Sequence, residues 1–249
     1  EVNVAPNQKR KHLPMSMSDL PRTIALLQEE SCVLIVDQTE LPYDLAYSEI
    51  RSWERMVDAI KRLEIRGAPA LGVAGAAAVY LYIANEVCCS KNNESVPLHS
   101  EEKTLPRNKH HSEYREHNKE RLLQDLDCVC ESISNARPTA VNLSWGVSRA
   151  QSRAHAAISN NEKLPELCAH VADEVIAIIA EDEACCRSIG SHGAALLPNK
   201  ATVLTHCNAG SLATAFYGTA LGVIYCAFEQ GKIERVFADE TRLLVKGPV

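Results

Sequence analysis

A single cysteine, Cys207, stands where an apolar stretch of the chain ends, and its thiol is the first candidate for chemistry. Residues 201–206 are typical of a strand, and the small residues Asn208, Ala209 and Gly210 predict a tight turn after it. Ligands of open α/β sheets bind at the carboxyl ends of the strands. A thiol there can serve as acid, base or nucleophile when N–H groups or cations lower its pKa. Core packing is the commonest alternative, and metal binding lacks partner ligands.

A second candidate is Arg66-Gly67-Ala68, which precedes an alanine-rich stretch typical of a helix. The guanidinium supplies charge-assisted donors, the glycine permits close backbone approach, and the helix start adds free N–H groups, so the motif suits a phosphate. A turn with a solvated arginine explains the same residues equally well. Arg137, held out of helical geometry by Pro138, is a candidate second phosphate donor, although a surface charge is the commoner role.

The histidines near these motifs are weaker candidates. His206 adjoins Cys207, but successive side chains of a strand point to opposite faces, so we expect no Cys–His dyad. His110, His111 and His117 lie in a polar stretch that is typical of a flexible loop. We therefore predict no metal site.

The elements that position these groups follow from the spacing of apolar residues. The sequence predicts strands over residues 32–36, 201–206 and 233–238, and helices over 47–63, 68–84, 122–133, 164–197 (interrupted near Gly190) and 211–230. If the last two strands are parallel, Asp239 ends at the same edge of the sheet as Cys207.

The predicted fold class is α/β with two domains. Residues 1–18 are expected to be a disordered tail, and residues 19–160 a small β plus helical domain with a polar insertion at about 90–120. Residues 161–249 read as the first part of a Rossmann-like α/β domain. Two strands cannot bury their own sheet, so we expect the chain to be part of a larger fold.

Composition limits the classes of partner. The 249 residues are 46% apolar with a formal charge of −6, which provides no basic field for nucleic acid or a membrane surface. A small phosphorylated substrate needs only local arginines. Residues 68–84 carry no charge over 17 positions, the short limit for crossing a bilayer, and their alanine and glycine content favours a buried core helix.

The ten cysteines do not form a disulfide or zinc pattern. Several are adjacent pairs in helical stretches, where neighbouring side chains diverge. We expect nine of the ten to be small buried apolar residues in a reducing compartment, with Cys207 as the exception.

Together these motifs resemble the methylthioribose-1-phosphate isomerases of methionine salvage. That family is related to the regulatory subunits of the guanine-nucleotide exchange factor for translation initiation and to ribose-1,5-bisphosphate isomerases. The matching motifs occupy, in the order of the family, residues 36–42, 65–72, 137–143, 189–193, 205–210 and 237–242. The resemblance implies conversion of 5-methylthioribose 1-phosphate to 5-methylthioribulose 1-phosphate without a cofactor or metal, a homodimer, and a cytoplasmic location, with a nuclear one also compatible.

The resemblance also implies roles for individual residues. Arg66, Gly67, Ala68 and Arg137 match phosphate-binding positions, and Cys207 matches the position that acts at C1–C2 of the sugar. The exchange-factor subunits generally lack these features, and ribose-1,5-bisphosphate would need a second basic cluster. Both remain as alternatives.

The match departs from the family pattern near the last residues. Lys246 stands where the family has a substrate-contacting glutamine; a lysine can approach a phosphate but offers no carbonyl acceptor. No Gly-Ala-Asp segment, which carries the family's second acid/base group, occurs after Arg242. Each such group contributes about 10²–10⁴ in rate. We therefore expect no appreciable isomerase turnover from these 249 residues alone.

Overall fold

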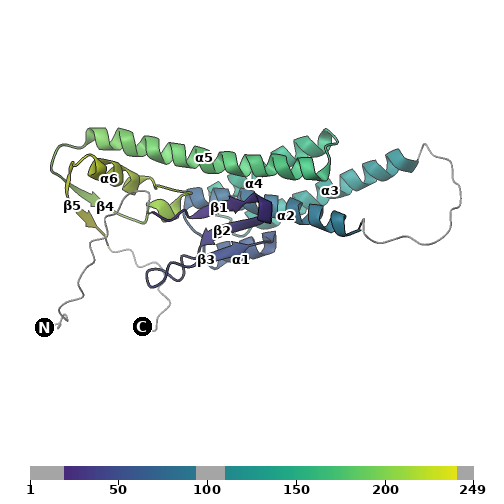
Figure 1. Ribbon diagram of the computed structural model, residues 1–249, viewed down its shortest axis with the longest axis horizontal. Coiled ribbons are helices and arrows are strands. Elements are labelled where there is room, and N and C mark those ends of the chain that lie inside the picture. The colour runs from purple at the N-terminus through teal and green to yellow at the C-terminus, as the bar shows by residue number, and fades with distance from the viewer. Residues whose placement is uncertain (1–19, 94–109, 240–249) are drawn as a thin grey trace.

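The computed structural model describes residues 20–93 and 110–239, and the side chains of residues 20–85 and 119–239 (Figure 1). The predicted tail over residues 1–18, most of the polar insertion, the side chains of the three clustered histidines, and Lys246 lie outside this part of the chain.

The first layer is an antiparallel sheet in the order β1-β2-β3, built from β1 (Ile24–Leu27), β2 (Cys32–Val36) and β3 (Tyr47–Ile50), with a 3-10 turn, η2 (Gln28–Glu30), after β1. The predicted strand over residues 32–36 is confirmed. The predicted helix over 47–63 is wrong at its start, because residues 47–50 pair with β2 along the register that joins Val33 to Ile50.

Helix α1 (Trp53–Lys61) begins where a serine caps it. The Ser52 side chain accepts a hydrogen bond from the Arg55 backbone N–H at 3.2 Å, which satisfies one of the free donors of the first turn. The helix buries Met56, Ala59 and Ile60. The start of α1 is thus set by the Ser52 cap and by the pairing of β3 with β2, rather than by the spacing of apolar residues.

Helix α2 (Ala68–Asn93) is the central helix of the molecule and packs against the two following long helices, α4 (Val141–Ser159) and α5 (Leu164–Leu196). Its window Ala68–Asn85 is apolar enough for a membrane span, but 78% of that window is buried inside the protein. The prediction of a core helix is confirmed. A Cβ on Gly146 would lie 1.9 Å from the Gly72 carbonyl oxygen, so α2 and α4 meet in backbone contact.

The predicted polar insertion is shorter than expected, because helices extend into both of its ends. Helix α2 continues to Asn93, and α3 (His110–Ser134) already begins at His110. The helical prediction for residues 122–133 is confirmed within α3, and residues 135–140 form the expected break around Pro138.

The last part of the chain is a parallel β-α-β unit made of β4 (Ala201–Thr205), α6 (Ala220–Glu229) and β5 (Ile233–Ala238), with a 3-10 turn, η3 (Ser211–Ala213), after β4. Both strands were predicted. The helix predicted over 211–230 is wrong in its first half, since Tyr217 and Gly218 have φ of 78° and 89°. The Thr214 side chain also accepts the Gly218 N–H at 3.2 Å, which stabilises this irregular path.

Helix α5 runs along most of the length of the molecule and connects the sheet and helical core to the β4–α6–β5 unit (Figure 1). The predicted interruption at Gly190 is wrong, because the helix is continuous there. The glycine instead permits close packing: a Cβ on Gly190 would lie 2.9 Å from the Gly222 carbonyl oxygen of α6. The larger hydrophobic core joins β1–β3 to α1–α5, and a smaller one consists of Cys186, Phe216 and Tyr217.

Candidate functional site: an arginine loop packed against the segment that follows Cys207

Arg66 is held in place by a buried amide. Its Nε donates a hydrogen bond to Gln38 Oε1 at 3.0 Å, and Gln38 Nε2 donates to the Leu212 carbonyl at 2.7 Å. Gln38 is 3% exposed. One side chain therefore ties the arginine before α2 to the segment that follows Cys207.

The charge of Arg66 is not balanced by the described part of the protein. The guanidinium is half-buried, and among the described residues its recorded hydrogen bond is to the neutral Gln38 rather than to a carboxylate. Burial lowers the pKa of Arg66 from its usual high value. A partly desolvated cation at the start of a helix, beside free N–H groups, favours an anionic ligand.

Gly67 brings this loop into backbone contact with residues 211–215, which we call the anchoring segment. Its φ is +95°, and a Cβ there would lie 2.4 Å from the Cα and the carbonyl oxygen of Ala213. No side chain fits this approach. Ala68 follows on the exposed first turn of α2.

The anchoring segment is fixed by two other parts of the fold. Thr23 donates its hydroxyl hydrogen to the Ser211 carbonyl at 2.6 Å and its N–H to the Ala215 carbonyl at 3.2 Å. From α5, Asp182 Oδ2 accepts the Ala215 N–H at 2.6 Å. Burial raises the pKa of the Asp182 carboxyl, against the opposing effect of that hydrogen bond.

Cys207 follows the carboxyl end of β4, as predicted, and is exposed with a φ of +69°. The expectation that Asp239 ends at the same edge is confirmed, since its N–H donates to the Thr205 carbonyl at 3.1 Å. His206 Nδ1 lies 2.9 Å from Asp239 Oδ2. The histidine therefore contacts the residue that follows the neighbouring strand.

Arg137 lies half-buried in the loop before α4. The starts of α2 and α4 are neighbours, because a Cβ on Gly72 would lie 3.1 Å from the Asn142 carbonyl oxygen. The structure therefore brings Arg66 and Gly67 against the segment after Cys207, and places Arg137 before a helix whose start lies beside that of α2.

The prediction that nine cysteines are buried is wrong for four of the seven of them that the structure describes. Cys128 and Cys185 are exposed, and Cys168 and Cys226 are only partly buried; Cys207, the predicted exception, is exposed. Cys185 and Cys186 show the reason, because adjacent positions of α5 point in different directions and only Cys186 is buried. No disulfide links any of the described cysteines, which are Cys32, Cys128, Cys130, Cys168, Cys185, Cys186, Cys207 and Cys226.

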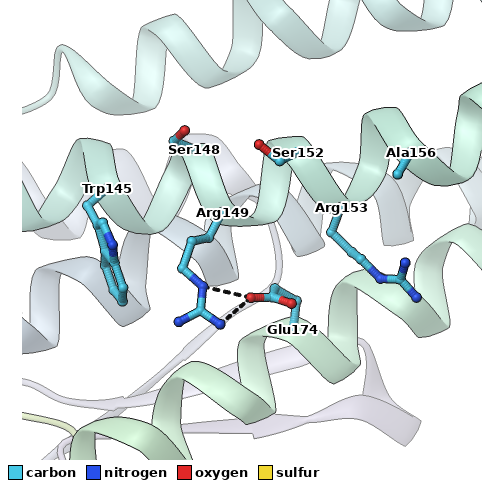
Figure 2. Close-up of a pocket in the computed structure, with 7 residues that line it drawn as sticks. All are labelled: Trp145, Ser148, Arg149, Ser152, Arg153, Ala156 and Glu174. Carbon is cyan, nitrogen blue, oxygen red and sulfur yellow. Dashed lines mark hydrogen bonds and ion pairs between the residues drawn. The ribbon is translucent and has the colours of Figure 1, made fainter.

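A separate groove of about 480 Å³ lies between α4 and α5 (Figure 2). It is lined by Trp145, Ser148, Arg149, Ser152, Arg153, Ala156 and Glu174. Arg149 donates to Glu174 at 2.7 Å, pairs with Glu181, and lies 5.2 Å over the Trp145 ring. Arg149 is thus neutralised by carboxylates, and none of the predicted site residues lines the groove.

Sequence reasoning missed the three side chains that organise the site: Gln38, Thr23 and Asp182. Each bonds to the anchoring segment or to Arg66 across more than 25 positions of sequence. The one local signal was the polar pair Asp37-Gln38 at the end of a buried strand, which marks a strand end near the sheet edge.

The chain is similar in sequence to curated proteins that are named as sugar-phosphate isomerases. The chain is 40% identical over 225 residues to a methylthioribose-1-phosphate isomerase from Nostoc sp., covering 89% of this chain and 56% of the relative. It is 41% identical over 216 residues to a 5-deoxyribose 1-phosphate isomerase from Moorella thermoacetica, covering 86% and 53%. The chain thus spans about half the length of the curated relatives that it matches.

Solved structures agree with these relatives. The crystal structure of 5-methylthioribose 1-phosphate isomerase from Pyrococcus horikoshii is similar with a TM-score of 0.71 at 29% identity, covering 94% of this chain and 57% of that one. Translation initiation factor eIF-2B subunit delta from A. fulgidus is similar with a TM-score of 0.65 at 36% identity, covering 89% and 55%. The model of the initiation factor 2 subunit family matches residues 64–248. The chain belongs to the initiation factor 2 subunit family.

Proposed function

We propose that this chain carries part of the active site of an aldose–ketose isomerase that converts 5-methylthioribose 1-phosphate into 5-methylthioribulose 1-phosphate. The observation that carries the proposal is the unbalanced Arg66 cation, oriented by Gln38 and packed against the segment that follows Cys207. The names of the relatives from Nostoc and Pyrococcus horikoshii support the same reaction.

The substrate phosphate would bind the Arg66 guanidinium and the N–H groups of Gly67 and Ala68, where charge and helix dipole both favour an anion. Arg137, and Lys246 at the position of the family's glutamine, would add further donors. This arrangement would leave C1 and C2 of the sugar toward Cys207.

The reaction needs acid/base groups rather than a redox cofactor. A phosphate on C1 blocks spontaneous ring opening, so one group must protonate the ring oxygen, and hydrogen must then move between C2 and C1. Cys207 would act at C1–C2, as a base or by stabilising the transition state. An anchored phosphate lowers the entropic cost of bringing these carbons to the thiol.

The finer architectural assignments belong to the same proposal. They are a Rossmann-like character for the β4–α6–β5 unit, a domain boundary near residue 160, a homodimer, and a reducing, cytoplasmic location with a nuclear one also compatible. The parallel pairing of β4 with β5 supports the first of these, and the lack of disulfides among the described cysteines supports the last.

Three other activities compete with this proposal. A regulatory role in translation initiation is favoured by the similarity to eIF-2B subunit delta, and a 5-deoxyribose 1-phosphate substrate by the Moorella relative. A regulatory subunit has no requirement for an uncompensated arginine tied to the segment that follows an exposed thiol, which favours an isomerase. Ribose-1,5-bisphosphate would require a second basic cluster opposite Arg66.

Protection of Cys207 from alkylation tests the proposal. Iodoacetamide modification is followed cysteine by cysteine by peptide mass spectrometry, with the exposed Cys128 and Cys185 as internal references. Methylthioribose 1-phosphate at ten times its Kd should slow Cys207 modification by about tenfold, because a shielded thiol reacts only in the free protein. The two reference cysteines should react unchanged.

The control variants are two arginine truncations. Arg66→Ala should abolish protection, whereas Arg153→Ala, an arginine of the α4–α5 groove, should retain it. Absence of protection in the unmodified protein, or equal protection in both variants, would contradict the proposed site. Equal protection by 5-deoxyribose 1-phosphate would broaden the substrate class.

A further inference from the structure

Asp239 makes two contacts with the residues immediately before Cys207. Its N–H donates to the Thr205 carbonyl at 3.1 Å, and its Oδ2 lies 2.9 Å from His206 Nδ1. The backbone and the side chain of Asp239, the residue after β5, therefore both bond to the residues at the end of β4. These two contacts join the carboxyl ends of β4 and β5 immediately before Cys207.

Cys207 itself requires restraint, since its φ is +69°. The left-handed region is disfavoured by roughly five- to thirtyfold for an L residue relative to the right-handed one. The far side of the turn is fixed by the Ala209 carbonyl, which accepts from the Thr219 and Leu221 N–H groups at 3.0 and 3.3 Å. On the near side, the His206–Asp239 contact supplies the side-chain restraint.

The exposure of the His206–Asp239 pair indicates whether the pair affects Cys207 alone or the stability of the whole protein. The His206 and Asp239 side chains are 74% and 52% exposed. Such exposed contacts contribute little to the overall stability of a protein. Any effect of losing this one is therefore expected at the adjoining Cys207, whose backbone conformation is disfavoured, rather than in global unfolding.

We propose that His206 and Asp239 form a positioning pair that holds the Cys207 thiol in its left-handed turn for the isomerisation. The inference rests on the proposed function for the meaning of the thiol, but the geometry is independent of any substrate. His206 acts here through the backbone of its neighbour and has no direct role in the chemistry.

Alkylation without any sugar phosphate tests this inference. In His206→Ala and Asp239→Ala, the iodoacetamide rate of Cys207 should change by up to about fivefold, which is the most that an exposed pair of this kind contributes. The rates of Cys128 and Cys185 should stay the same in these variants. His206→Asn should restore the Cys207 rate, because its amide nitrogen sits where Nδ1 does and can donate to Asp239.

A second exposed histidine–aspartate pair is the matched control. His155 Nε2 lies 2.7 Å from Asp127 Oδ1 on α4 and α3, so His155→Ala removes the same kind of contact elsewhere and should leave the Cys207 rate unchanged. Unfolding in any variant would show as reaction of the buried Cys130 and Cys186.

Three results would overturn the inference: an unchanged Cys207 rate in both alanine variants, parallel changes at all three exposed cysteines, or no restoration by His206→Asn. Asp239→Asn, which keeps an oxygen acceptor, provides a second rescue should an alanine variant fail to fold. If methylthioribose 1-phosphate fails to protect Cys207 but the His206 and Asp239 variants still change its alkylation rate, only the proposed function is contradicted.

Discussion

Gly67 is the residue at which local geometry and the candidate site are most closely linked. Its φ of +95° and the 2.4 Å distance from a built Cβ to the Ala213 backbone exclude any side chain. The same close approach brings Arg66 next to the anchoring segment. The packing of the loop at residues 66–68 against the anchoring segment thus depends on the missing side chain of Gly67.

Gly67→Ala should lower the free energy of unfolding by roughly 2–4 kcal/mol, from a left-handed alanine and a backbone overlap together. The matched control is Gly231→Ala, where φ is +69° but nothing lies within 4 Å of the added Cβ. That variant should lose only about 1 kcal/mol. Urea denaturation measures both, and equal losses would show that the contact with Ala213 carries no strain.

At the scale of single residues, the sequence predicted candidate functional residues but not the side chains that hold them in place. Arg66, Gly67 and Cys207 could be proposed as candidates because arginine, glycine and cysteine have few roles at a helix start or a strand end. Gln38 and Asp182 were not found, because their bonds to Arg66 and Ala215 join elements that are distant in sequence. Periodicity reports which face of an element is buried, not which polar side chain crosses to another element.

Among the elements, α5 connects the two parts of the chain and also orients the site. Its Asp182 accepts the Ala215 N–H at 2.6 Å, which attaches the anchoring segment to the long helix. The helix over 68–84 and the strands at 32–36 and 233–238 were predictable from apolar runs. Residues 47–50 and 211–219 were not, because strand pairing and positive φ values at residues 217 and 218 override helical spacing there.

Asp182 provides a pH-dependent test at the level of these elements. Burial raises its pKa, so the folded state disfavours the carboxylate, and the resulting loss of stability develops as pH rises from the unfolded pKa of about 3.9 through the higher folded value. Asp182→Asn keeps an oxygen acceptor without the charge. It should therefore gain stability relative to the unmodified protein between about pH 4 and neutrality.

Denaturant unfolding at several pH values measures this difference. Asp173→Asn, an exposed position on the same helix, is the matched control for loss of one negative charge from α5. A stability difference for Asp182→Asn that is constant with pH, or that shrinks toward neutrality, would be incompatible with a buried carboxylate at this position.

On the scale of the whole molecule, the β4–α6–β5 unit is less enclosed than the rest. The larger core joins the antiparallel sheet to the long helices, whereas the smaller one contains three fully buried residues. Leu204 is 69% exposed and Phe237 51%, so the parallel sheet is only partly covered in the described part of the chain. The apolar composition predicted a hydrophobic core. It did not predict that the core is divided into two clusters, because that depends on which helices pack against each other.

The central claim is that one sugar phosphate is bound jointly by the loop at residues 66–68 and by the turn at Cys207. A crystal structure of the Cys207→Ser protein soaked with methylthioribose 1-phosphate tests it most directly. The account predicts density for a phosphate on the Arg66 guanidinium and the Gly67 and Ala68 N–H groups, with C1 and C2 of the sugar facing residue 207. Ligand bound elsewhere with Arg66 unoccupied, or a sugar turned away from residue 207, would contradict it.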